Sequence, residues 1–140
     1  MPKINESELK KEIKSGDFKN AYLLYGEESY LKEYYASELK NKIVDKTFEA
    51  FNFHYFDGKD TELDDILKDA QMLPMMSEYN FVMVKDYPIE KSANDIKLLE
   101  EYLKDAPDTT VFVFWFDAIE PDVKSAKFKK VIKAFEKAGD

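Results

Sequence analysis

A glycine and a lysine stand near the point where a buried strand is predicted to pass into a helix, in the stretch YGEESYLKE (25–33). A phosphate-binding loop has the pattern G-x-x-x-x-G-K-[ST], in which backbone N–H groups, the lysine and the hydroxyl hold phosphates and magnesium. Gly26 and Lys32 match that pattern. Leu31 replaces the second glycine, however, and Glu33 replaces the hydroxyl. The stretch could be a nucleotide site, the remnant of one, or an ordinary turn between a strand and a helix.

The departures from the pattern all oppose phosphate binding. The side chain of Leu31 stands where a phosphate must approach bare backbone, and Glu33 brings the wrong charge. Glu27 and Glu28 add further negative charge inside the loop. We therefore expect a degenerate loop that binds no nucleotide. Lys32 alone does not restore the site, because a lysine on an exposed helix turn is usually solvated.

A second set of residues that could do chemistry is acidic and follows the predicted strands. Ligands of parallel α/β sheets bind beyond the carboxyl ends of the strands, and Mg²⁺ prefers carboxylate oxygens. One interpretation is a Mg²⁺-dependent phosphoryl-transfer or receiver-like domain. The other is that these acids merely end strands and cap helices, which we favour because acids are abundant throughout the chain. The residues concerned are Glu27, Glu28, Asp57, Asp86 and Asp117.

The third unusual stretch is MLPMMSEY (72–79), between a predicted helix and a predicted strand. Pro74 should end the helix. The large apolar residues around it could be buried, with methionine filling irregular gaps. On the tip of a loop they would instead form an apolar plug for a pocket on a partner protein. Spacing alone leaves both interpretations open for Met72, Leu73, Met75 and Met76.

The elements that must position these residues alternate along the chain. Strands that alternate with helices predict a mainly parallel sheet between two helical layers, an α/β/α fold with right-handed crossovers. The apolar run TTVFVFWF should be covered on both faces. We predict helices over 6–15, 28–44, 62–72, 92–104 and 124–138, and strands over 20–25, 50–57, 80–86 and 109–116.

Several positions indicate where these elements begin and end. Gly16 is a plausible C-cap of the first helix, and Ser92 a plausible N-cap of the fourth. Thr61 is predicted to cap the third helix, with Asp64 as the acid of a capping box. In the strand predicted over 50–57, alternation places Phe51, Phe53 and Tyr55 on one face.

The composition excludes several other kinds of chemistry. The chain has 140 residues, which suits a single domain over 1–140. It has no cysteine, its only histidine is His54, and all its basic residues are lysines. Thiolate sites and arginine clamps are therefore excluded, and a single histidine gives triads and histidine-rich metal sites almost nothing to work with. The net charge of −8 repels phosphate backbones, and no apolar run is long enough to span a bilayer. The lack of cysteine agrees with a reducing cytoplasm.

Five segments together resemble a known family. They are AYLLYGEESYLKEYY, FNFHYFDG, LPMMSEYNFVMVKD, LLEEYLKDAPDTTVFVF and KFKKVIKAF, and in order and spacing they extend over nearly all of 18–136. YGEESYL and LPMMSEYNFVMV are the most specific. In order and spacing they resemble the N-terminal domain of the delta subunit of the bacterial DNA polymerase III clamp loader.

The resemblance implies a P-loop NTPase fold of the AAA+ type whose nucleotide site has been lost, without catalytic residues, cofactor or metal. It also implies that the domain binds the sliding clamp, the beta subunit, and helps to open it. In the family the contact is an apolar pair before the third strand, which falls on Met75 and Met76, with Leu73 and Pro74 beside it. This chain departs from the Leu-Phe pair of some relatives. It also lacks an arginine that is common just after the pair.

Members of that family are longer than this chain. The resemblance implies that a further strand, a lid and a helical collar follow, and that the collar binds the other clamp-loader subunits. Contact with DNA would be only indirect, contact with a membrane is not expected, and the location would be cytoplasmic. If the further strand is missing, one edge of the sheet is left open for pairing.

Overall fold

Four parallel strands form the centre of the computed structural model, in the spatial order β1-β4-β3-β2. The structure describes residues 6–16, 18–25, 29–44, 46–118 and 124–138. All four strands run the same way, as the alternation of strands and helices predicts. The strands are β1 (Ala21–Leu24), β2 (Phe53–Asp57), β3 (Asn80–Lys85) and β4 (Thr110–Trp115).

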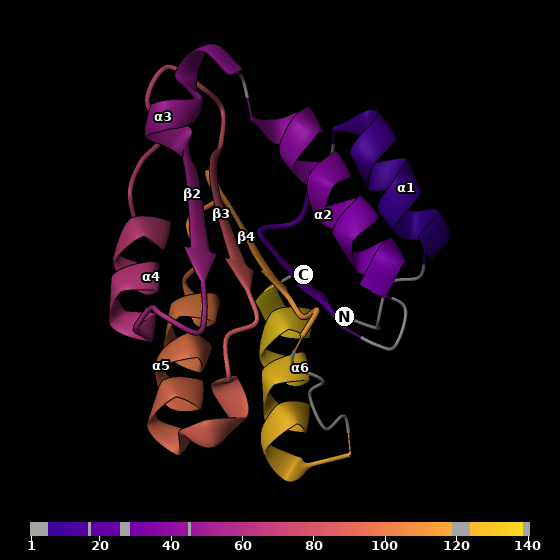
Figure 1. Ribbon diagram of the computed structural model, residues 1–140. Coiled ribbons are helices and arrows are strands. Elements are labelled where there is room, and N and C mark those ends of the chain that lie inside the picture. The colour runs from indigo at the N-terminus through magenta and orange to yellow at the C-terminus, as the bar shows by residue number, and fades with distance from the viewer. Residues whose placement is uncertain (1–5, 17, 26–28, 45, 119–123, 139–140) are drawn as a thin grey trace.

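Helices cover both faces of this sheet, which confirms the predicted three-layer α/β/α fold (Figure 1). One face carries α1 (Glu6–Ser15) and α2 (Ser29–Ile43). The other face carries α4 (Leu63–Ala70), α5 (Ala93–Lys104) and α6 (Ala126–Ala138). Three short pieces complete the described elements: η1 (Lys46–Phe48), α3 (Glu49–Asn52) and η2 (Ile89–Lys91).

The central strand β4 shows why the sheet needs two helical layers. All six of its residues are buried, as the continuous apolar run predicts. Phe112 and Phe114 face the core beneath α4, α5 and α6, whereas Val111 and Val113 face the core beneath α2. Alternate side chains of a strand point to opposite faces, so one apolar run supplies both cores.

The beginnings and ends of helices follow local chemistry in two of the three predicted cases. Gly16 has a φ of +81°, the left-handed conformation expected after a helix end, and the Oγ of Ser92 accepts a hydrogen bond from the Asp95 N–H at 3.2 Å. The predicted cap at Thr61 is wrong. Its hydroxyl donates to the Asp57 carbonyl at 2.9 Å, and α4 begins after Glu62 without a side-chain cap.

The prediction of a strand over 50–57 is wrong at its start. Residues Glu49–Asn52 form the short helix α3, and β2 begins only at Phe53. The physical reason lies in the neighbouring strand: pairing between β2 and β3 begins at Phe53 and Phe81, so residues before Phe53 have no ladder to join. Phe51 consequently points away from the core and is exposed.

Two buried tyrosines belong to the core, and one of them connects α1 to the strand that follows it. The Tyr22 hydroxyl donates to Glu12 Oε1 at 2.5 Å and accepts from the Lys19 N–H at 2.9 Å, which ties α1 to β1. Burial, and then the hydrogen bond to Glu12, raise the pKa of Tyr22 above its ordinary value. Burial likewise raises the pKa of Tyr102 on α5. Both tyrosines are therefore neutral parts of the folded core.

Candidate protein-docking site

The segment between α4 and β3 carries large apolar side chains into solvent. Leu73 is 76% exposed and Met76 is 80% exposed, and Met72 and Met75 are about half exposed. Pro74 is partly exposed. The alternative that these residues fill a gap in the core is therefore wrong. We call residues 72–76 the apolar tip.

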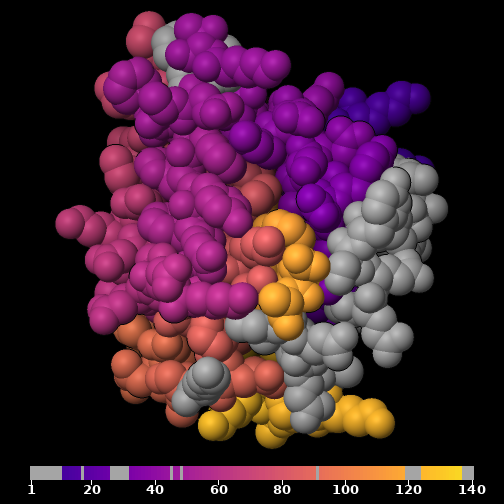
Figure 2. All heavy atoms as spheres, in the orientation of Figure 1, coloured from indigo at the N-terminus to yellow at the C-terminus, as the bar shows by residue number. Residues whose placement is uncertain are grey.

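The apolar tip lies at the amino ends of the strands. It precedes β3, and α3 precedes β2, so both segments meet at the same end of the sheet. Figures 1 and 2 show α3 at the uppermost end of the molecule, away from α5 and α6. The tip is thus presented at a projecting end rather than in a hollow of the surface.

Hydrogen bonds from buried side chains hold this exposed segment in place. The amide of Asn52 donates to the Met75 carbonyl and accepts from the Met75 N–H, both at 2.7 Å. The amide nitrogen of Asn80 donates to the carbonyls of Asp69 and Met72. Met76 has a φ of +57°, so the backbone turns sharply within the tip. The tip therefore has a defined backbone although its side chains are exposed.

The helix that leads into the tip is also fixed. The hydroxyls of Tyr102 and Thr110 both donate to the Ala70 carbonyl at 3.1 Å, at the last residue of α4. A carbonyl at a helix end has no partner within the helix, so these two bonds satisfy it. The position from which the tip departs is set by α5 and β4.

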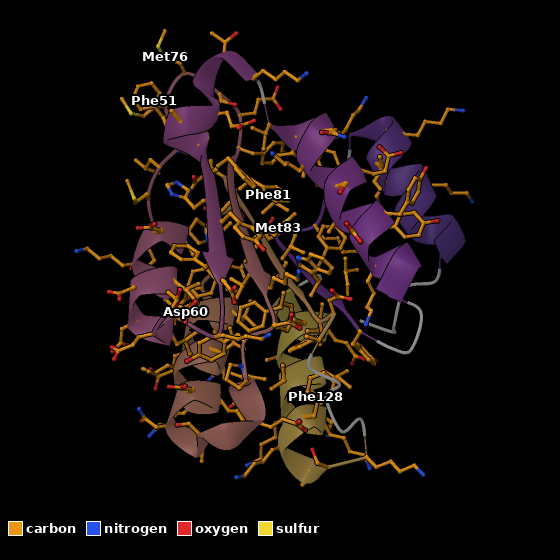
Figure 3. All side chains as sticks on the ribbon, in the orientation of Figure 1. Phe51, Asp60, Met76, Phe81, Met83 and Phe128 are labelled. Carbon is orange, nitrogen blue, oxygen red and sulfur yellow. The ribbon has the colours of Figure 1, made fainter. Side chains whose placement is uncertain are left out.

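Phe51 is a residue of this surface that sequence reasoning did not assign to it. It is 54% exposed on α3, and Figure 3 shows it at the same end of the molecule as Met76. Its alternation with Phe53 and Tyr55 favoured a strand, so its place on an exposed helix was not predicted. Asn52 gave no warning either, because a polar residue between Phe51 and Phe53 fits the alternation of a strand.

The carboxyl ends of the strands are organised differently. Asp86 is only 2% exposed, and its two carboxylate oxygens accept hydrogen bonds from the N–H groups of Asp117 (2.7 Å) and Ala118 (3.2 Å). Asp117 lies 3.7 Å from the Lys85 ammonium, and Asp57 accepts from the Lys59 N–H. These acids shape turns, as the second interpretation of the sequence holds.

The described residues offer little support for a magnesium site at this end. In the described ranges, no group of three or more His, Cys, Asp or Glu residues is placed to hold a metal. Glu27 and Glu28, which belong to the acidic set in the sequence, lie outside those ranges. The sequence-based hypothesis of a phosphoryl-transfer or receiver-like domain therefore has no observation in its favour.

The residues of the degenerate loop are only partly described. Gly26 lies outside the described residues, Leu31 belongs to α2, and Glu33 is exposed. The expectation that Lys32 is solvated is wrong, because it is buried. It shares the inner face of α2 with Tyr35, at a spacing of three residues.

No helix within the described ranges has the length and apolar character needed to cross a bilayer.

The fold and the exposed tip together define a class: an AAA+-like α/β/α domain with an apolar surface at the amino ends of its strands. The family model for the DNA polymerase III delta subunit matches residues 22–138. The chain belongs to that family. This confirms the resemblance found in the sequence.

Individual relatives agree with this assignment. The chain is 32% identical over 134 residues to the DNA polymerase III subunit delta of Bacillus subtilis strain 168, covering 91% of this chain and 38% of the relative. The solved structure of the Bacillus subtilis DNA clamp loader delta protein superposes with a TM-score of 0.76 at 28% identity, over 91% of this chain and 40% of that one. The chain thus spans about two fifths of the length of these relatives.

A more distant structure shares the fold. A DNA polymerase III gamma subunit-related protein from Thermotoga maritima superposes with a TM-score of 0.62 at 17% identity, covering 94% of this chain and 44% of that one. At this identity the likeness concerns the architecture alone.

Proposed function

We propose that this chain is the clamp-engaging part of a replication clamp loader, and that it docks on the sliding clamp through Leu73, Pro74, Met75 and Met76. In this role it helps to open the clamp for loading onto DNA, and it neither binds nor hydrolyses ATP. The observation that carries the proposal is the solvent exposure of the apolar tip in a member of the delta subunit family. Other clamp-loader subunits would supply ATP hydrolysis, and DNA would be contacted only indirectly.

The chemistry of the tip suits a protein partner with an apolar pocket. Fully burying one leucine or methionine side chain contributes about 1.5–3 kcal/mol, so a few such residues suffice for a specific contact. Methionine is unbranched and adapts to irregular pockets, which allows the pair Met75 and Met76 to replace a Leu-Phe pair. Phe51 would extend the contact from α3.

Replacing the methionine pair tests the proposal directly. In the variant carrying Met75→Ser and Met76→Ser, the affinity for the immobilised cognate clamp should fall by about 3 kcal/mol, roughly a hundredfold. Both side chains are exposed, so the thermal unfolding midpoint should change little. The matched control is Tyr34→Ala, which removes an exposed aromatic from α2 on the other face of the sheet. Equal binding by the chain and the serine variant would disprove the proposal.

The absence of ATP handling is tested separately. A ligand that binds only the folded state raises stability by RT ln(1 + [L]/Kd). We expect millimolar ATP with Mg²⁺ to leave the unfolding midpoint unchanged, because of the substitutions at Leu31 and Glu33. A rise of several degrees would show that the loop beginning at Gly26 still binds nucleotide.

A further inference from the structure

The side chain of Asn52 makes an unusual pair of contacts with a residue far along the chain. Its amide nitrogen donates to the Met75 carbonyl and its amide oxygen accepts from the Met75 N–H, each at 2.7 Å. This is the pairing that a neighbouring strand would offer through its own peptide groups. Asn52 therefore takes the place of a strand partner for Met75, in a segment that has no strand pairing of its own.

The burial of Asn52 makes these contacts necessary rather than incidental. Asn52 is 2% exposed, so an amide without partners there would carry a large desolvation cost. The Met75 backbone satisfies both ends of this amide, the donor and the acceptor. The position of α3 and the position of Met75 are thus linked, and displacement of one leaves buried polar atoms unpaired in the other.

The rest of the apolar tip has little else to hold it. Residues 71–79 contain no helix or strand, and Leu73 and Met76 pack too little to be fixed by a core. The bonds from Asn80, Tyr102 and Thr110 end at Met72 or earlier. Among the residues that the structure describes, the hydrogen bonds that reach the exposed part come from Asn52, beside the left-handed turn at Met76.

We infer that Asn52 is a positioning residue of the docking site, which fixes the Met75 backbone so that Leu73, Met75 and Met76 are held in one arrangement before the partner arrives. The inference rests on the proposed function, because it assigns a role within the same docking site. Ordering a loop on association weakens binding, so a loop that is fixed beforehand binds more tightly. Asn52 itself need not touch the partner.

The first test measures the contact without any partner. Hydrogen exchange of the Met75 amide should be slow in the chain and should accelerate at least tenfold in Asn52→Ala. The control is Ser92→Ala, which also removes a side-chain bond to a backbone N–H but lies beyond the opposite end of β3. This control should leave exchange at Met75 unchanged. Unchanged exchange in Asn52→Ala would overturn the inference.

The second test measures affinity for the immobilised cognate clamp. Asn52→Ala should bind roughly tenfold more weakly, while Ser92→Ala should bind as the unmodified chain does. Asn52→Asp, which keeps the size and the acceptor but loses the donor, is the second variant if alanine impairs folding, and it should also bind more weakly. Binding within twofold by both Asn52 variants would overturn the inference and leave the proposed function standing.

A double-mutant cycle separates positioning from general destabilisation. If Asn52 acts through the tip, Asn52→Ala should cost clearly less affinity in a Met76→Ala background than in the unmodified chain. Strict additivity of the two losses would contradict the inference. If the unmodified chain does not bind the clamp at all, the proposed function fails and the inference falls with it, whatever the exchange at Met75 shows.

Discussion

At each end of the sheet a buried polar side chain, a carboxylate or an amide, holds the backbone of a distant segment by hydrogen bonds. The consequences for the surface differ between the two ends. At the carboxyl ends, the Asp86 carboxylate accepts hydrogen bonds from the N–H groups of Asp117 and Ala118, which links the residue after β3 to the residues after β4. At the amino ends, Asn52 holds Met75 and leaves the apolar side chains around it in solvent. Ligands of parallel α/β sheets usually bind at the carboxyl ends. In this protein the described acids at the carboxyl ends hold the backbone of turns, and the exposed apolar surface lies at the amino ends.

The largest expected effect lies at the carboxyl ends and concerns stability alone. A Cβ added to Gly58 would stand 2.3 Å from the Tyr87 Cα, a backbone atom that cannot move aside cheaply. Gly58→Ala should therefore lower the free energy of unfolding by about 3 kcal/mol, at the upper end of overpacking costs. Urea unfolding followed by circular dichroism measures this. An unfolding midpoint like that of the unmodified chain would show that this end is less rigid than the structure implies.

Asp86→Ala should have the next largest effect. It leaves two backbone N–H groups without their carboxylate, so we expect a loss of about 2–3 kcal/mol in the free energy of unfolding. The loss should be the same with and without Mg²⁺. A stabilisation by Mg²⁺ that disappears in Asp86→Asn would instead support a metal at the carboxyl ends and break the contrast between the two ends.

Leu73→Ser should differ from the two preceding variants, because it should weaken binding to the clamp and leave stability nearly unchanged. Leu73 is mostly exposed, so the free energy of unfolding should change by no more than about 0.5 kcal/mol. Affinity for the clamp should fall by about 1.5 kcal/mol, roughly tenfold, because an apolar anchor is lost. Surface plasmon resonance and thermal unfolding on the same preparation give both numbers. A destabilised variant with unchanged affinity would show that Leu73 serves the fold rather than docking.

The smallest expected effect is a loss of stability at alkaline pH, which involves neither end of the sheet. Folding raises the pKa of Tyr22 and Tyr102, so the folded state holds protons that the unfolded state releases above its ordinary tyrosine pKa of about 10. Their contribution is therefore fully present below about pH 10 and is lost as the pH rises further. Urea unfolding from pH 8 to 11 should show this decline, and Tyr22→Phe should reduce its slope. A stability that rises over this range would contradict the assignment of neutral buried tyrosines.

Much of the architecture could be predicted because its signals are local. The alternation of apolar runs and helical periods predicted the sheet and the order of the main helices, and Ser92 and Gly16 marked helix ends by their own conformational preferences. The start of β2 could not be predicted this way. Whether residues 49–52 form a strand depends on a partner strand, and β3 extends only one residue, Asn80, beyond the first pair, Phe53 with Phe81.

The candidate site also combines features that the sequence predicts with features that depend on tertiary contacts. From the residues alone, Met72, Leu73, Met75 and Met76 could be buried or exposed, and only the resemblance to a family selected the docking interpretation. Burial of Lys32 and exposure of Phe51 were both missed, since each depends on which face of a helix meets the sheet.

The sequence by itself determined the parallel α/β/α fold, the absence of cysteine and arginine chemistry, and an apolar segment before β3, because periodicity and composition are properties of the chain alone. The tertiary structure decided that this segment is exposed and that Asn52 fixes it. Exposure and long-range hydrogen bonds exist only once elements distant in the chain have been brought together, so no local pattern encodes them.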